Sequence, residues 1–191
     1  MRFLIHLGLF ITIALLIGFS LSYLALDQAR MFGTFRQGPW LSWKDVGSPR
    51  PDPYSMAYGA KTGALFLTRA EGIRFVATSD SNGQTLMANC AYRVDGTTPV
   101  SAFWSLVAPD PNDELINQKA TPPAMDSRRL ARNRDGSFLI RVSPALAAGN
   151  WLETSGRGNF KLVLTLYDTT MFSGLGALDQ QLPAILLEGC Q

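Results

Sequence analysis

The stretch FLIHLGLFITIALLIGFSLSYLAL, residues Phe3 to Leu26, contains no Lys, Arg, Asp or Glu and divides the chain into two parts. At about 1.5 Å rise per residue, a helix of this length exceeds the roughly 30 Å hydrocarbon core of a bilayer. A cleavable signal peptide has a shorter apolar core, and Tyr23 to Ala29 lack an Ala-x-Ala cleavage pattern. We therefore predict a signal-anchor helix over residues 1–26, with a removed signal peptide as the alternative.

The charges that flank this helix do not settle its orientation. Arg2 lies on one side and Arg30 and Arg36 lie on the other, whereas the positive-inside rule depends on a local excess. His6, the chain's one histidine, is close to the helix end. We interpret it as an interfacial residue rather than as part of a proton relay.

Small residues recur at every fourth position of the helix, at Ala14, Gly18 and Ser22. This spacing places them on one face, where another transmembrane helix can approach closely. The alternative is that small residues are simply common in apolar helices. Helix pairing on this face is one of our predictions.

The rest of the chain has the size of one globular domain and a balanced charge. Without Arg2, the 17 Lys and Arg become 16 against 15 Asp and Glu, which gives no basic surface of the kind that binds nucleic acid. The domain also has no histidine, which excludes Ser-His-Asp and Cys-His catalysis and histidine-based zinc or iron sites. We expect neither a cofactor nor a metal.

Cys90 and Cys190 are the two cysteines of the chain. In an exported domain a disulfide is the natural pairing, and it would also hold the C-terminal end of the chain in place. Two free buried thiols are the alternative.

Short runs of aliphatic, aromatic and β-branched residues dominate the domain and predict strands. Turn signals separate them, among them Asp95-Gly96 and Asp135-Gly136. The predicted strands are 64–69, 73–79, 86–94, 100–107, 137–142, 160–167 and a last strand at 185–187, with one more short strand within a long loop between Pro109 and Arg134.

This succession without alternating helices indicates an all-β antiparallel sandwich or jelly roll. We expect a juxtamembrane linker at residues 27–37 and a β domain at residues 38–191. Asp52, Pro53 and Gly63 have the pattern of an N-cap, a first-turn proline and a C-terminal glycine, so they predict one short helix. Trp40 and Trp43 favour a first strand over an interfacial tryptophan pair.

Four arginines form the densest basic patch of the domain, and they are Arg128, Arg129, Arg132 and Arg134. Guanidinium groups in one loop can bind a phosphate or carboxylate bidentately, although such a run is usually a solvated loop with nearby aspartates. Trp104 and Trp151 are candidate sugar-stacking residues, but their apolar neighbours favour core packing. These six residues make up the candidate ligand site.

A glycosidase needs two facing carboxylates. Most acidic residues here stand beside Gly, Pro, Ser or Asn, where they are better explained as turn residues; these are Asp80, Asp95, Asp110 and Asp135. Glu71 and Glu153 are less clearly turn residues, but no spacing brings two carboxylates together. We therefore expect a protein that is not an enzyme, with a carboxylate-dependent glycoside hydrolase as the least favoured alternative.

Four segments in order resemble the domain-of-unknown-function family 1214: AFWSL at 102–106, NRDGS at 133–137, NWL at 150–152 and FKLVLTLY at 160–167. The resemblance implies a jelly-roll-like domain of bacterial envelope proteins and no established activity. Longer relatives begin with a domain of family 1254, in whose place this chain has the apolar helix. The family's Tyr-Asp after the Phe-Trp-Ser strand is Ala108-Pro109-Asp110 here.

These observations favour a single-pass protein of the bacterial inner membrane whose domain lies in the periplasm. We expect it to bind protein as a subunit or accessory factor of an envelope assembly, with a partner of the family 1254 type as one possibility. A module that binds carbohydrate or anionic polymer, such as a cell-wall glycan, is the alternative.

Overall fold

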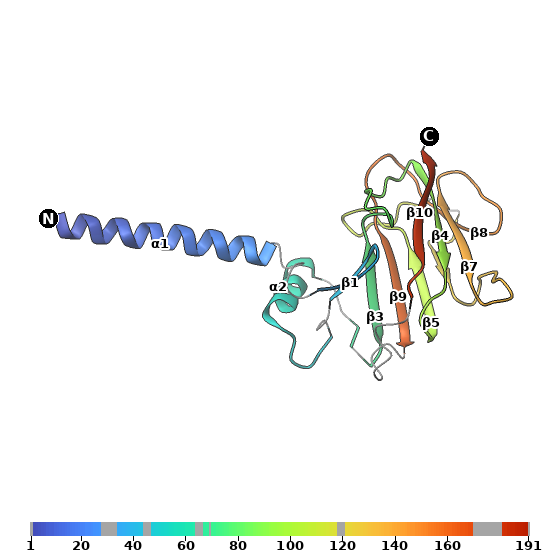
Figure 1. The fold of residues 1–191 in the computed structure, drawn as a ribbon, viewed down its shortest axis with the longest axis horizontal. Coiled ribbons are helices and arrows are strands. Elements are labelled where there is room, and N and C mark those ends of the chain that lie inside the picture. Colours follow the sequence, from blue (N-terminus) through green and yellow to red (C-terminus); the bar gives the residue numbers. More distant parts are fainter. Residues whose placement is uncertain are drawn as a thin grey trace. The chain divides into compact units, whose positions relative to one another are not determined.

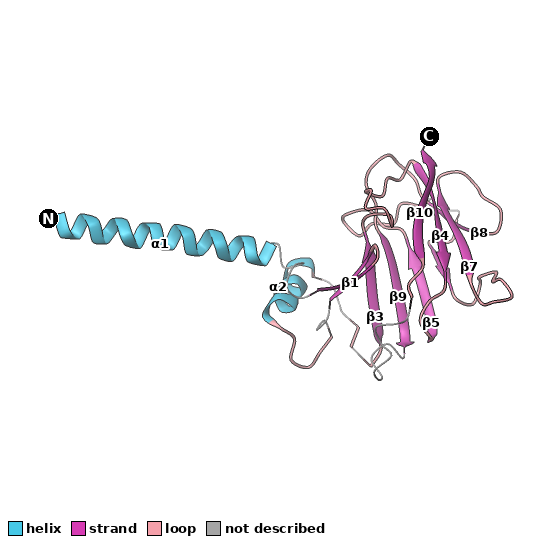
Figure 2. Cartoon of the chain, viewed as in Figure 1, coloured by secondary structure: helices cyan, strands magenta, loops and turns pink. Residues whose placement is uncertain are grey.

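The computed structural model describes residues 2–27, 34–43, 47–63, 67–68, 70–117, 121–169 and 181–190. The chain divides into two compact units, one with residues 1–34 and 44–66 and one with residues 35–43 and 67–191. The helices belong to the first unit and the strands almost entirely to the second (Figures 1 and 2). Each unit is described by itself.

In the first unit, helix α1 (Arg2–Asp27) contains a segment, Arg2–Leu24, that is long and apolar enough to cross a membrane, with a mean hydropathy of 2.4. None of this segment is buried within the protein. Helix α2 (Pro53–Thr62) confirms the predicted short helix. The Asp52 carboxylate accepts hydrogen bonds from the backbone N–H groups of Tyr54 and Ser55, and Gly63 ends the helix with φ of 61°.

In the second unit, ten described strands form two sheets. The bounds are β1 Thr34–Gln37, β2 Trp40–Trp43, β3 Gly72–Ala77, β4 Cys90–Gly96, β5 Ser101–Val107, β6 Ala124–Asp126, β7 Phe138–Ser143, β8 Asn150–Glu153, β9 Leu162–Thr169 and β10 Ala184–Cys190. One sheet has the order β1-β2-β3-β9-β5-β6 and the other has the order β10-β4-β7-β8. Figure 1 shows β3, β9 and β5 running side by side.

The strands alternate between buried and more exposed residues, as expected when one face of a sheet is covered. In β9, Leu162, Leu164 and Leu166 are buried, and in β7 Phe138 and Ile140 are buried. Side chains from both sheets belong to one hydrophobic cluster. The all-β sandwich is therefore confirmed.

Two tryptophans connect parts of the sandwich that are far apart in sequence. The Trp40 indole N–H donates to the carbonyl oxygen of Pro183, just before β10, at 2.7 Å. Trp104 of β5 and Phe138 of β7 bring their ring centroids to 5.2 Å, which joins the two sheets. Trp40 is fully buried in β2, so a strand at this position is confirmed, although it is the second strand and β1 precedes it.

The antiparallel prediction is wrong at one edge, because β7 and β8 pair in parallel. Parallel neighbours usually need a crossover of a dozen or more residues. Here residues 144–149 suffice, since β8 is short and starts beside Ile140, in the middle of β7. We predicted no strand at Asn150–Glu153.

Several predicted boundaries shift. The strand predicted at 86–94 begins only at Cys90, since Cys90 N–H donates to the Met87 carbonyl oxygen in a turn. The predicted linker at 27–37 ends in strand β1, while residues 28–33 lie outside the described residues. Residues 64–66 and 69 of the first predicted strand also lie outside them. The short strand expected between Pro109 and Arg134 is β6, and the expected last strand is β10.

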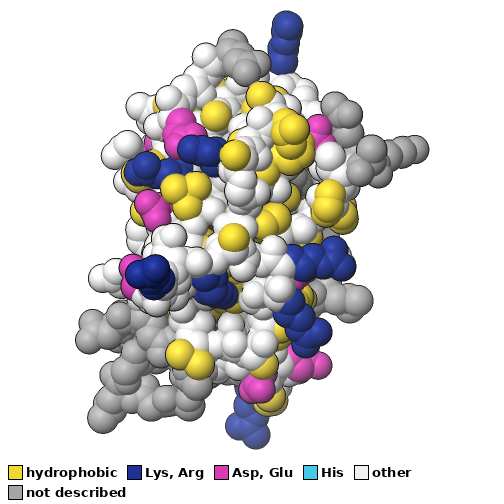
Figure 3. All heavy atoms as spheres, turned by 90° about the vertical axis from the view of Figure 1, so that its right-hand side faces the viewer, with side chains coloured by type: hydrophobic (Ala, Val, Ile, Leu, Met, Phe, Trp, Pro, Cys, Tyr) yellow, Lys and Arg dark blue, Asp and Glu magenta, His cyan; other side chains and the backbone are white. Residues whose placement is uncertain are grey.

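The surface carries no large area of a single charge in the view of Figure 3. That view faces the side on which β7 and β8 lie in Figure 1, and it shows hydrophobic side chains interspersed with basic and acidic ones.

Gly72 provides a test of the six-stranded sheet. A Cβ atom at this position would lie 2.1 Å from the carbonyl oxygen of Leu166 in β9, so one of the two strands would have to move. We expect Gly72→Ala to lower the free energy of unfolding by about 3 kcal/mol. Gly158→Ala is the matched control, because a Cβ there has no atom within 4 Å. Equal denaturation midpoints for the two variants would contradict the close approach of β3 and β9.

Candidate functional site

The four arginines lie in the loop between β6 and β7, which we call the arginine loop (residues 127–137). Asp126 begins it, since its carboxylate accepts hydrogen bonds from the backbone N–H groups of Arg128 and Arg129 at 2.8 and 3.1 Å. A second turn ends it, where Asn133 N–H donates to the Ser137 carbonyl oxygen and Gly136 has φ of 83°. The local sequence thus fixes the loop at both ends.

The guanidinium groups of Arg128 and Arg132 lie on different sides of β5. Arg128 lies over the Phe103 ring at 5.5 Å, and Arg132 lies over the Trp104 ring at 5.9 Å. Phe103 and Trp104 are successive strand residues, so their side chains point to opposite faces of the sheet. The loop therefore does not gather these two groups around one anion.

Arg132 has mainly local partners. Its guanidinium also lies 5.6 Å from the Phe138 ring and donates to the Gly136 carbonyl oxygen at 3.1 Å. It covers the contact between Trp104 and Phe138 that joins the two sheets. This arginine is better explained as a cover for the core edge than as a ligand group.

Arg129 and Arg134 are exposed. Arg129 approaches the Asp126 carboxylate at 3.8 Å with 80% of its side chain exposed, so this ion pair is weak. Hydrogen bonds from the Ser137 hydroxyl and backbone N–H hold the pKa of Asp135, next to Arg134, below its ordinary value. Asp135 is consequently charged at neutral pH and offsets part of the positive charge of the loop.

The two candidate stacking residues differ in their exposure. Trp104 is 2% exposed, so no sugar can stack on it. Trp151 is half-buried on β8, and its indole N–H donates to the hydroxyl and carbonyl oxygens of Ser143 at 3.1 and 3.2 Å. Core packing, the interpretation that the sequence favoured, accounts for Trp104.

The side chain of Asn150 joins the arginine loop to the four-stranded sheet. Its amide group donates to the carbonyl oxygens of Ala131 and Leu139 at 2.8 and 2.9 Å and accepts from Ala131 N–H at 2.8 Å. Asn150 thereby attaches the arginine loop, through Ala131, to strand β7, through Leu139.

An aromatic pair that sequence reasoning missed lies on the outer face of the six-stranded sheet. Phe103 and Tyr167 are cross-strand partners in β5 and β9, with ring centroids 5.7 Å apart, and Gly72 is the partner of Tyr167 on the other side. Both rings are half-buried, and Arg128 stacks on one of them. We call Phe103, Tyr167 and Arg128 the aromatic face. Strand alternation was the signal that could have found it, because both aromatics occupy outward positions.

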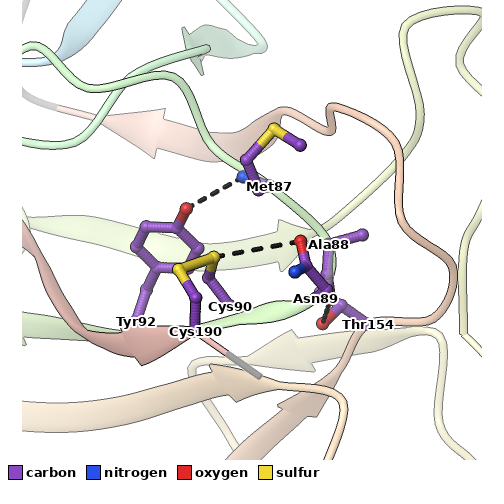
Figure 4. Close-up of a disulfide and its surroundings, with 7 residues drawn as sticks. All are labelled: Met87, Ala88, Asn89, Cys90, Tyr92, Thr154 and Cys190. Carbon is purple, nitrogen blue, oxygen red and sulfur yellow. Dashed lines mark hydrogen bonds between the residues drawn. A yellow bond between two sulfur atoms is a disulfide. The ribbon is translucent and has the colours of Figure 1, made fainter.

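The disulfide between Cys90 and Cys190 is confirmed. The two cysteines are cross-strand partners at adjoining ends of β4 and β10. Figure 4 shows Tyr92 beside the disulfide, with its hydroxyl accepting from the Met87 N–H at 2.8 Å, while the Thr154 hydroxyl donates to the Ala88 carbonyl oxygen. Burial raises the pKa of Tyr92, so its hydroxyl stays neutral at physiological pH.

The remaining sequence predictions concern the helix and metals. Ala14, Gly18 and Ser22 are exposed in α1, and helix pairing through them stays a prediction. Within the described residues, no group of three or more His, Cys, Asp and Glu side chains is arranged to hold a metal ion.

Reduction of the disulfide tests its contribution to stability. It closes a loop of sequence separation 100, for which loop-closure entropy predicts a loss of up to about 4.7 kcal/mol on reduction. Guanidinium unfolding of the full-length protein in detergent, with and without dithiothreitol, measures this loss. The double variant Cys90→Ser, Cys190→Ser should show no response to the reductant, whereas an unresponsive native protein would contradict the prediction.

The arginine loop makes a separate prediction about Arg132 and Arg129. Since Arg132 lies over two rings, Arg132→Ala should lower the free energy of unfolding by about 1 to 2 kcal/mol. Arg129→Ala, the matched control from the same loop, should change it by less than about 0.5 kcal/mol. Thermal denaturation measures both, and an equal effect of the two substitutions would refute the covering role of Arg132.

One of two similar solved structures supports the fold. The VPA0106 protein from Vibrio parahaemolyticus matches with a TM-score of 0.58 and 22% identity, over 72% of this chain and 35% of that one. A putative uncharacterized protein from Burkholderia cenocepacia matches with a TM-score of 0.43 and 18% identity, over 87% and 38% of the two chains. This chain thus spans little more than a third of either protein. No curated protein matches its sequence.

A family model described as protein of unknown function, DUF1214, matches residues 71–171. The match covers strands β3 to β9, including the aromatic face and the arginine loop. It extends over 101 of the 191 residues, more than half of the chain. The protein therefore belongs to the DUF1214 family.

Proposed function

We propose that this protein is a membrane-tethered binding domain that docks a partner protein on its aromatic face. The tether is α1, whose apolar side chains are exposed along its length and would be buried by a bilayer. The Cys90–Cys190 disulfide favours a compartment outside the cytoplasm. Together they suggest an inner-membrane protein with its β-sandwich in the periplasm.

The observation that carries the docking proposal is the stack of Arg128 on Phe103 beside Tyr167. Aromatic and arginine side chains dominate the energetic centres of protein interfaces. Aromatic rings bury a large area with few rotatable bonds, and a guanidinium group donates several hydrogen bonds at once. Arg128 is exposed and its guanidinium can still bind a carboxylate. The partner surface should thus present an acidic side chain next to an apolar one, and a protein of the family 1254 type is the first to test.

The geometry favours protein binding over the two alternatives. The polymer site predicted from the sequence would need its arginines to converge beside an open Trp104 ring, whereas Arg128 and Arg132 lie on opposite faces of β5 and Trp104 is buried. Glycosidase chemistry would need two facing carboxylates. The carboxylates of Asp80 and Asp110 instead accept backbone hydrogen bonds in their own turns.

Co-purification of the full-length protein from mild detergent tests this proposal. We expect Arg128→Ala and Tyr167→Ala each to reduce the recovered partner at least tenfold, because each removes part of the contact centre. Arg157→Ala is the matched control, since Arg157 is also an exposed arginine and lies between β8 and β9. Thermal denaturation checks that the variants remain folded.

Each other outcome is informative. Retention of the partner by both variants would refute docking at the aromatic face. Recovery of a cell-wall glycan in place of a protein, lost on Arg128→Ala, would replace the proposal by the anionic-polymer alternative.

A further inference from the structure

A small cavity of about 180 Å³ lies on the four-stranded sheet, away from the aromatic face, between the end of β10 and the crossover from β7 to β8. Ala91 and Gly189, which pair across β4 and β10, contribute to its lining. Two of the smallest residues thus face each other in register, which leaves room above the sheet. Residues 144–147, with the sequence Pro-Ala-Leu-Ala, form an uncharged wall.

The lining also includes the polar residues Asn89 and Ser143 and two side chains of opposite charge, Arg141 from β7 and Glu188 from β10. The Arg141 Nε and Glu188 Oε2 atoms are 3.7 Å apart, too far for a good hydrogen bond. The side chains are 42% and 34% exposed, so their ion pair stabilises the protein little and separates at small cost. Both groups can bind a ligand.

A β-bulge places Glu188 in this position. The pairing of β10 with β4 shifts register between Leu187 and Gly189, so Glu188 has no cross-strand partner. Bulges redirect a side chain and are frequent beside functional sites. Arg141 is held from the other side, where its Nη1 donates to the Ala148 carbonyl oxygen at 3.5 Å, and its remaining N–H groups stay available.

We propose that this cavity binds a free α-amino acid with a short apolar side chain. The ligand carboxylate binds the Arg141 guanidinium, and the ligand ammonium binds the Glu188 carboxylate. The side chain contacts the uncharged wall of residues 144–147. A cavity of about 180 Å³ has room for one small amino acid.

The proposal is independent of protein docking, because the cavity and the aromatic face lie on different sheets. Its test uses saturation-transfer NMR on the full-length protein in nanodiscs of phosphatidylcholine. The probes are L-alanine, propionate, which lacks the ammonium group, and ethylamine, which lacks the carboxylate. We expect L-alanine to bind at least tenfold more tightly than either singly charged probe. Absence of L-alanine binding, or equal affinity for propionate, would overturn the proposal.

Two charge-neutralising substitutions locate the site. Arg141→Gln and Glu188→Gln should each weaken L-alanine binding at least tenfold while leaving the fold intact, because both side chains are substantially exposed. Arg93→Gln is the matched control. Arg93 is the cross-strand partner of Arg141 in β4 and does not line the cavity. Its substitution should change the affinity less than twofold, and a tenfold loss there would show a diffuse charge effect instead of a site.

Discussion

The contact between Trp104 and Phe138 is the interaction on which the other features depend. Trp104 belongs to the six-stranded sheet and Phe138 to the four-stranded sheet, so their packing sets the distance between the two layers. Removal of either ring would leave a large cavity at the edge of the core. Arg132 covers this edge, and Asn150 holds the loop that carries it. Among the four arginines, Arg132 is therefore explained by how the sandwich is closed.

Strand periodicity explains why the two outer faces have different chemistry. Because successive residues of a strand point to opposite faces, burial of Trp104 and Leu166 places Phe103 and Tyr167 outside on the six-stranded sheet. By the same rule, burial of Val142 places Arg141 outside on the four-stranded sheet. The alternation of buried residues along the strands thus gives the six-stranded sheet an aromatic outer face and the four-stranded sheet a charged outer face.

The sequence predicts well what depends on short-range patterns. The predicted strands have the alternation of half-buried strands, α2 has its capping residues within one segment, and two cysteines allow a single intramolecular pairing. The sequence does not predict what depends on long-range register. The parallel pairing of β8 depends on the register that sets Asn150 beside Ile140 of β7. The bulge at Glu188 depends on the register between β10 and β4. No local residue preference encodes either alignment.

The candidate site shows the same division. The four arginines are close together in sequence, which suggested a cluster. In the structure, Arg128 and Arg132 stack on successive residues of β5 and therefore lie on opposite faces of the sheet. Arg141 and Glu188 are distant in sequence and come together only through the pairing of β7 and β10 with β4. Proximity along the chain is thus a poor guide to convergence in a sandwich built from non-consecutive strands.

The disulfide connects stability with the geometry of the charged outer face. Cys190 follows Glu188 by two residues, and its bond to Cys90 holds the end of an edge strand that pairs with β4 alone among the described strands. An unattached strand end would fray, and Glu188 would then leave its place opposite Arg141. The Cys90–Cys190 bond therefore preserves the pairing of Gly189 with Ala91 and the position of Glu188 beside Arg141, a constraint that packing of the exposed residues at the end of β10 could not supply.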